Sequence, residues 1–356
     1  MTPGNLRDIP SGVFDPVLDR LTAEGARLFD DADMRLDAVA YQERPFSYVL
    51  RVRVRHSRAD ASGPHLFIKV FKDKALDGGR QMRSRVAQDF VTTRTIHEFM
   101  SRWDDLGTVR PVACYDDLLA LVTEETEGRT LLHYVEDEGR WFPSREALGN
   151  LTSTMDTVGR WLRAFHGFDD RRSQVAVADL RRYVDLRLER LVASGQIISA
   201  VDRQRVLDHL DALGLDIPPA DLREVVIHAD MAPANILVSG RRVVVLDFAM
   251  ANRGSYLHDI SRLFLQLDLL RAKPQFRPRV VEALQTALLR GLDPSLTPVH
   301  PLFRFLSMLH RINHLGTLSL GKERFPANLF SIRVRYLHRQ WIESELESGP
   351  RQVKPR

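Results

Sequence analysis

The stretch VIHADMAPANILV, residues 226–238, places three polar side chains between two apolar runs. His228, Asp230 and Asn235 interrupt segments rich in Val, Ile and Leu, the residue types expected in buried strands. The pattern predicts two strands joined by a short loop. Because rigid strands on either side would hold such a loop in place, its polar side chains are the first candidates for a functional site.

The segment after this loop predicts a hairpin that returns a further acid to it. Ser239 and Gly240 form a turn signal between NILV and VVVL, and Asp247 ends the returning strand. We expect the hairpin to bring Asp247 near Asn235, on the same side as Asp230. These side chains supply oxygen ligands, which Mg²⁺ prefers while keeping positions for phosphate oxygens. The sequence therefore predicts a magnesium site here.

Length and composition favour a soluble, two-lobed protein. The chain has 356 residues, more than a single core usually supports, and 44% of them are hydrophobic. No run of about 18 apolar residues predicts a transmembrane segment, and the N-terminus does not read as a signal peptide. The single cysteine, Cys114, excludes an internal disulfide, fits a cytoplasmic location and is expected to be a small core residue.

The charge balance argues against nucleic-acid binding. The formal net charge is +4, but only six of the 51 basic residues are Lys, and the arginines are spread along the chain beside 47 acids. No basic tract is interleaved with aromatic residues, as single-strand binding would require. We expect no nucleic-acid partner, and the sequence leaves the oligomeric state open.

The pattern along the chain changes from strands to helices near residue 128. In the first part, 47–56 and 65–73 predict a hairpin with Lys69 in its second arm, 80–102 a helix, and 109–125 two more strands. Beyond residue 128, periodicity predicts helices at 150–168, 177–194, 198–213, 278–291, 301–316 and 328–346. We expect an α+β protein with a lobe at 1–127 and a helical lobe at 128–356, with ends at 1–13 and 348–356 poorly ordered.

The central motif resembles that of the protein-kinase-like phosphotransferases, and most closely the aminoglycoside phosphotransferase and choline kinase branch. That signature is His-x-Asp-x-x-x-x-Asn followed by Asp-Phe-Gly or a variant, and the matching residues here are His228, Asp230, Asn235 and Asp247-Phe248-Ala249. The resemblance implies a bilobal fold, with a small antiparallel-sheet N-lobe and a larger, mostly helical C-lobe. It also implies ATP and Mg²⁺ as cofactors.

The resemblance also implies roles for the motif residues. Asp230 would be the catalytic base for the acceptor hydroxyl, and Asn235 and Asp247 would hold Mg²⁺. His228 would support the loop. Asp259 of HDISRL, residues 258–263, would be a buried acid that braces the catalytic loop.

In the N-terminal lobe the resemblance assigns Lys69 to the α- and β-phosphates of the nucleotide. The acid that pairs with this lysine would be Asp89, with Glu98 as the alternative. Backbone groups near Glu124 and Glu125 would meet adenine. The segment 40–49, where a nucleotide-covering loop is expected, contains no glycine, and Ser47 could offer its hydroxyl or amide to a phosphate.

Two other motifs are set aside. GTLSLGKE, residues 316–323, nearly spells a P-loop, but Glu323 stands where Ser or Thr is needed and the preceding segment predicts a helix. His310 and His314 are four apart on a predicted helix. They lack the Glu of a zinc-protease motif and lie among Leu and Ile, so we expect them to pack rather than to bind a metal.

The acceptor is expected to be a small molecule. Only twelve positions separate Asp247 from Asp259, with no Ala-Pro-Glu, so there is no long activation segment to dock a peptide. The insertion at 170–223 balances its acids with arginines, which favours a neutral or anionic acceptor such as a sugar, a sugar phosphate or an amino alcohol. One alternative is a pseudokinase or nucleotide-binding scaffold that acts through a protein partner. The other is a kinase of a lipid-linked saccharide.

Overall fold

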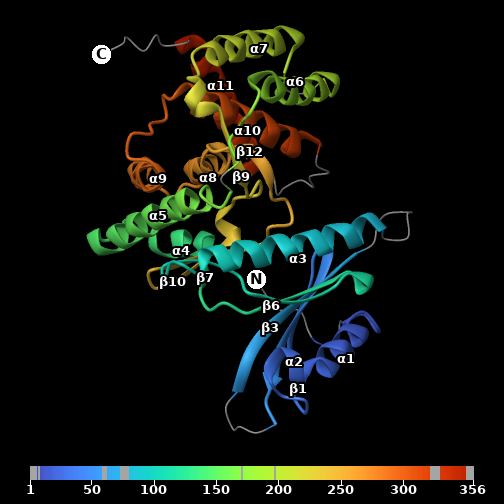
Figure 1. Cartoon of the computed structure of the whole chain (residues 1–356). Helices are drawn as coiled ribbons and strands as arrows, with labels where there is room; N and C mark the ends of the chain where they lie inside the picture. The colour runs from blue at the N-terminus through green and yellow to red at the C-terminus, as the bar shows by residue number, and fades with distance from the viewer. Residues whose placement is uncertain are drawn as a thin grey trace. The chain divides into compact units, whose positions relative to one another are not determined.

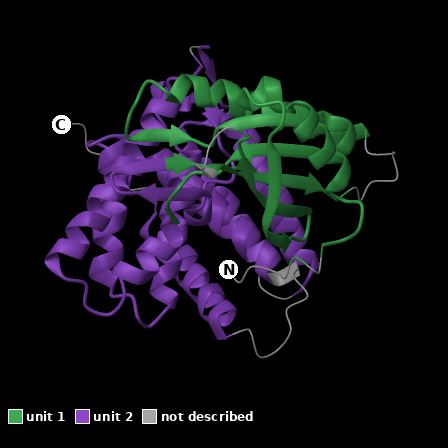
Figure 2. Cartoon of the chain, turned by 90° about the horizontal axis from the view of Figure 1, so that it is seen from below, with its two compact units in different colours: residues 1–129, 244–250 green, residues 130–243, 251–356 purple. Residues whose placement is uncertain are grey.

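The computed structural model describes Leu6 and residues 9–57, 62–72, 80–169, 171–195, 198–320 and 329–349. The chain divides into two compact units, shown in green and purple in Figure 2. Unit 1 comprises residues 1–129 and 244–250, and unit 2 comprises 130–243 and 251–356. The segment 244–250, which carries Asp247, is thus grouped with the N-terminal residues although it follows the central motif.

Unit 1 is built on a five-stranded antiparallel sheet (Figure 1). Its strands lie in the order β1-β2-β3-β6-β5. The bounds are β1 Arg35–Glu43, β2 Ser47–Arg55, β3 Ser62–Phe71, β5 Pro111–Tyr115 and β6 Ala120–Glu124. Both predicted hairpins are confirmed, and the predicted helix is α3, Arg80–Met100. A short strand, β4 Leu106–Thr108, ends beside Val245, whose carbonyl accepts the N–H of Val109 at 3.3 Å.

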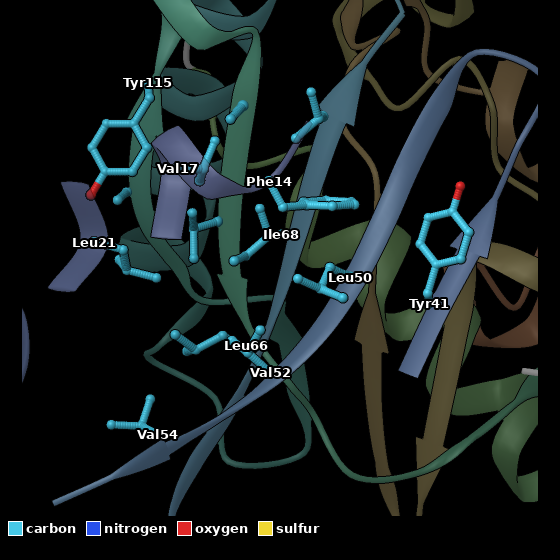
Figure 3. Close-up of a cluster of buried hydrophobic side chains, with 14 of the residues drawn as sticks. Phe14, Val17, Leu21, Tyr41, Leu50, Val52, Val54, Leu66, Ile68 and Tyr115 are labelled. Atoms are coloured by element: carbon cyan, nitrogen blue, oxygen red, sulfur yellow. The ribbon is translucent and has the colours of Figure 1, made fainter. Parts of the chain in front are cut away.

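Side chains of the sheet form a core with two N-terminal helices (Figure 3). The helices are α1, Asp15–Ala23, and α2, Gly25–Phe29, and neither they nor β1 are predicted from the sequence as elements. The buried residues of this core include Phe14, Val17, Leu21, Tyr41, Leu50, Val52, Val54, Leu66, Ile68 and Tyr115. Alternate residues of β2 and β3 enter this core, which leaves the side chains between them, Lys69 among these, on the other face of the sheet.

Unit 2 is mostly helical. Its helices are α4 Leu131–Glu138, α5 Arg145–Phe165, α6 Val177–Ala193, α7 Ala200–Leu215, α8 His258–Asp268, α9 Pro278–Leu292, α10 Pro301–Leu320 and α11 Leu329–Ser348. Six of them confirm the helices predicted from periodicity, while α4 and α8 are additional. Gly316 lies within α10, so a helix occupies the first part of the P-loop-like motif, and residues 321–323 of that motif lie outside the described residues.

Two helices of unit 2 cross at glycines. A Cβ on Gly159 of α5 would lie 2.3 Å from the carbonyl oxygen of Leu288, and one on Gly291 of α9 would lie 2.1 Å from that of Asp156. Real Cβ atoms do not approach backbone this closely. The absence of side chains at these two positions therefore permits the contact between α5 and α9.

The strands of the central motif follow the prediction closely. They are β9 Arg223–Ile227, β10 Ile236–Ser239 and β11 Arg242–Val245. β10 and β11 are neighbours joined by a turn in which Gly240 has a φ of 58°, a conformation that favours glycine. In unit 2, β9 also pairs antiparallel with β12, Asn252–Ser255, and with β8, Ser173–Gln174.

Candidate functional site

The loop after β9 is fixed by a buried carboxylate. Asp259, near the start of α8, is fully buried and accepts the backbone N–H of His228 at 2.6 Å and that of Ala229 at 2.9 Å. Ala229 has a φ of 63°, which is uncommon for a residue with a Cβ and requires support from its surroundings. The two hydrogen bonds provide that support. Asp259 thus contacts the loop as a bracing residue would.

The pKa of Asp259 indicates that its charge is retained. Burial alone would raise the pKa of this carboxyl, but the hydrogen bond and positive charge of His258, together with the backbone bond from His228, lower it to about 2. The loop is therefore held by a carboxylate that is ionised at neutral pH.

Asp230 and Asn235 contact each other directly. The Nδ2 atom of Asn235 donates to the backbone carbonyl of Asp230 at 3.0 Å and to its Oδ2 at 3.3 Å. His228 is buried, and its Nδ1 accepts the N–H of Asp230 at 3.3 Å. Because the amide nitrogen of Asn235 is committed to Asp230, its oxygen is the atom that suits a metal.

Arg262 belongs to the candidate site but was not predicted from the sequence. Its Nη2 atom donates to Oδ1 of Asp230 at 2.6 Å, and the side chains of Arg262 and Asp230 are 26% and 47% exposed. Arg262 lies three residues after Asp259 on α8. Residues three apart on a helix share a face, so the bracing acid itself was the available signal that Arg262 would lie beside the loop.

In unit 1, Lys69 pairs with Asp247. The Nζ atom of Lys69 lies 3.3 Å from Oδ2 of Asp247, and both side chains are partly exposed. Lys69 is central in β3, opposite Val49 on one side and Leu121 on the other. Asp247 has a φ of 64°, so its backbone is held in the left-handed region. The two residues together offer a cation and carboxylate oxygens for a nucleotide phosphate and its metal.

Asp89 and Glu98, the two acids predicted to pair with Lys69, both lie on α3. Asp89 is buried on α3, and its Oδ1 accepts the hydroxyl of Thr93 at 3.2 Å. The recorded ion pair of Lys69 is with Asp247, and Asp89 is not part of it. Glu98, the alternative, is exposed nine residues further along the helix.

The other nucleotide-binding candidates lie at the two ends of the sheet strands. Ser47 begins β2 and is buried, and its carbonyl accepts the N–H of Arg44. The N–H groups of Glu124 and Glu125 donate to the carbonyls of Arg110 and His65. A base bound at this segment would therefore use other backbone groups than these two N–H groups.

His310 and His314, which were set aside as metal ligands, contact other residues of unit 2. His310 contacts the carbonyl of His258 at 3.0 Å, and His314 contacts His338 at 2.9 Å. Among the described residues no group of three or more His, Cys, Asp or Glu side chains could hold a metal. Burial raises the pKa of the Cys114 thiol to about 11, which keeps it protonated and unreactive at neutral pH. No helix in the described part of the chain is long and apolar enough to cross a membrane.

Comparison with known proteins identifies the family and the fold. Residues 82–298, more than half of the chain, match the family model of the phosphotransferase enzyme family APH. No curated protein sequence matches the chain.

Solved structures share the fold at low sequence identity. Choline kinase from Cryptosporidium parvum Iowa II is 11% identical with a TM-score of 0.52, and 94% of this chain covers 96% of that one. Aminoglycoside phosphotransferase APH(4)-Ia, in a thermostable mutant crystallised with AMP-PNP and hygromycin B, is 15% identical with a TM-score of 0.53, and 95% of this chain covers all of that one. The α+β, protein-kinase-like fold is thereby confirmed, and the chain belongs to the APH phosphotransferase enzyme family.

Proposed function

We propose that the protein is an ATP- and Mg²⁺-dependent kinase that transfers the γ-phosphoryl group to a hydroxyl of a small molecule. The observation that carries the proposal is the pair of hydrogen bonds from the His228 and Ala229 amides to Asp259, which fixes the loop bearing Asp230. Family membership supports the reaction class. One structure with this fold, that of APH(4)-Ia, is a ternary complex with the nucleotide analogue AMP-PNP and the small molecule hygromycin B.

Each residue has a part in the transfer. The acceptor oxygen would form a bond to the γ-phosphorus while the bond to the β-phosphate oxygen breaks and ADP leaves. Asp230 would take the proton of the acceptor hydroxyl and later release it to solvent. Lys69 would bind phosphate oxygens of the nucleotide.

The donor set fits magnesium. The Asn235 amide presents its oxygen because its nitrogen is bonded to Asp230, and Asp247 has carboxylate oxygens. These hard oxygen ligands suit Mg²⁺, which takes few protein ligands. When bound, the metal would neutralise charge on the β- and γ-phosphates. Asn235 and Asp247 are the residues that would hold it.

The test is phosphoryl transfer from [γ-³²P]ATP to a panel of sugars, sugar phosphates, hydroxy acids and amino alcohols, with magnesium titrated. We expect Asp247→Ala to lower the rate at least 100-fold and to raise the magnesium concentration needed for half-maximal rate. Asp208→Asn, an exposed helix residue bonded to Gln204, serves as the control and should match the wild type. Equal rates and equal magnesium dependence in Asp247→Ala would overturn the assignment.

A nucleotide-binding scaffold is the second candidate, and one observation favours it. Lys69 pairs with Asp247 and Asp89 bonds to Thr93, and no ion pair joins Lys69 to Asp89 among the described residues, although the resemblance to active kinases implies one. A scaffold would gain thermal stability from Mg-ATP without transferring phosphate to any acceptor. Transfer that depends on Asp247 would exclude it.

A further inference from the structure

The candidate base is held by donors on both oxygens. Oδ1 of Asp230 accepts from Arg262 at 2.6 Å, and Oδ2 accepts from Asn235 at 3.3 Å. A guanidinium donates to a carboxylate in a strong, directional hydrogen bond. In this arrangement both carboxylate oxygens of Asp230 already accept a hydrogen bond, so an acceptor hydroxyl that approaches Oδ1 would compete with Arg262 for it.

Arg262 has unused donor capacity. A guanidinium carries five N–H donors in a planar fork that matches carboxylate and phosphate groups. The recorded bond from Arg262 uses only Nη2. Its Nε atom is buried with no hydrogen-bond partner among the described residues, while a quarter of the side chain remains exposed. Such a guanidinium is incompletely satisfied and reachable by a ligand.

Two imidazole rings lie within electrostatic range of Arg262. Burial lowers the pKa of both His310 and His314 of α10, and the positive charge of Arg262 lowers them further, which places Arg262 within electrostatic reach of both rings. These histidines are therefore neutral at pH 7. In the described part of unit 2, Arg262 forms its ion pair with Asp230.

Many acids elsewhere in unit 2 are paired with arginines. The recorded ion pairs are Asp169–Arg253, Asp179–Arg182, Asp185–Arg203, Asp211–Arg181, Glu224–Arg253, Asp268–Arg311, Glu282–Arg271 and Glu345–Arg304. A polycationic acceptor would have to compete with these internal pairs for each carboxylate. An anionic acceptor would have one such pair to displace, that of Arg262 with Asp230.

We propose that Arg262 recognises the acceptor, and that the acceptor is a hydroxyl compound carrying a carboxylate or a phosphate. The anionic group binds the Arg262 guanidinium and replaces Asp230 as its partner. Oδ1 of Asp230, which accepts from Arg262 in the structure, is then open to the acceptor hydroxyl. This inference rests on the proposed kinase function and names the chemical class of its substrate.

The kinetic test compares charged and neutral acceptors. Glycerol, D-glycerate and glycerol 3-phosphate share a backbone and differ in charge, and ethanolamine and L-serine form a second series. With the full chain, we expect turnover only of the acceptors that bear an anionic group. Arg262→Met should raise KM for them roughly 10- to 100-fold, the effect of losing a charged hydrogen bond, and Arg262→Lys should restore part of the affinity. Arg290→Met, which removes an arginine of α9 that is paired with Asp156 of α5, is the matched control.

A purely structural role for Arg262 predicts a different result. If Arg262 only positions Asp230, Arg262→Met lowers kcat equally for every acceptor and leaves the KM values unchanged. That outcome overturns the inference, as does turnover of glycerol or ethanolamine at rates equal to those of the anionic compounds.

A binding measurement requires no turnover. Thermal unfolding is followed with Mg-AMP-PNP present, with inorganic phosphate or D-glycerate added to 20 mM. Stabilisation of the wild type and of Arg290→Met, but not of Arg262→Met, supports the inference, and equal responses of all three overturn it. Failure of the proposed kinase function would give a different result. A protein that is not stabilised by Mg-AMP-PNP and does not consume ATP overturns both proposals.

Discussion

The Nζ atom of Lys69 lies 3.3 Å from Oδ2 of Asp247, although 178 positions separate the two residues in the chain. The segment 244–250 is grouped with unit 1, so the residue that follows the hairpin of the central motif becomes a partner of the N-terminal sheet. The pair brings together the predicted phosphate ligand and a predicted metal ligand.

Removal of the Lys69 charge should abolish activity without unfolding the protein. In Lys69→Met we expect ADP production to fall at least 100-fold, since the phosphates lose their cation. The melting temperature should change by only a few degrees because a partly exposed ion pair contributes about 0–1 kcal/mol. The measurement is a coupled ADP assay beside a thermal unfolding curve. Lys273→Met, which breaks the pair with Glu136 in unit 2, is the control that should retain activity.

Asp259 should determine the acid stability of the protein. Its pKa in the folded chain is about 2, below the ordinary value of 3.8, so its contribution is complete above about pH 4 and is lost as the pH falls toward 2. The size of the shift corresponds to about 2 kcal/mol. We expect Asp259→Asn to lower the free energy of unfolding at pH 7 and to flatten its dependence on pH between 4 and 2. An unchanged slope in urea titrations across that range would count against the bracing role.

His166 should also make the protein less stable as the pH falls, but in a higher pH range. Burial lowers its pKa to about 4, and neither ring nitrogen has a hydrogen-bond partner among the described residues. The unfolded chain binds a proton below about pH 6.5 and the folded chain does not, so stability falls as the pH drops from 6.5 to 4. We expect His166→Phe to reduce this fall and to stabilise the protein by about 1–3 kcal/mol, because two unpaired buried polar atoms are removed. Greater acid sensitivity in the variant would contradict this.

The glycines at the crossing of α5 and α9 should resist substitution. Gly159→Ala places a Cβ 2.3 Å from the Leu288 carbonyl, and the helices must separate, at a cost of about 1–3 kcal/mol. Gly149→Ala on the same helix α5 is the matched control. No atom lies within 4 Å of its Cβ, so the better helix propensity of Ala should stabilise the protein by up to about 1 kcal/mol. Chemical denaturation of both variants gives the comparison, and equal effects would contradict the close approach.

The sequence predicted elements whose side chains carry a periodic signal. The amphipathic helices of unit 2 and the alternating strands β2 and β3 were found because burial on one face imposes a period of about 3.6 or 2. By contrast, β8 and β12 are short and polar, and they become strands only by pairing with β9. The helix α1 carries Val17 and Leu21 four apart but has no capping side chain to mark its start.

The candidate site was predictable only in part, for a similar reason. His228, Asp230, Asn235 and Asp259 are close in sequence to strands or to a recognisable motif, and the structure brings them into contact. Arg262 was missed because a single arginine on a helix has no sequence signal apart from its spacing. The partner of Lys69 depends on which acid reaches it in three dimensions, and spacing along the chain does not determine that.

The most direct measurement is the kcat of phosphoryl transfer for Asp230→Asn with an acceptor that the wild type phosphorylates. The substitution keeps the size of the side chain and leaves one oxygen to accept from Arg262, but it removes the basic carboxylate and the second oxygen, which accepts from Asn235. We expect kcat to fall roughly 100- to 10,000-fold, as is typical when a general base is lost, with KM for ATP nearly unchanged. A kcat within a factor of two of the wild type, for the same acceptor and in the same Mg²⁺ concentration, would show that Asp230 is not the catalytic base.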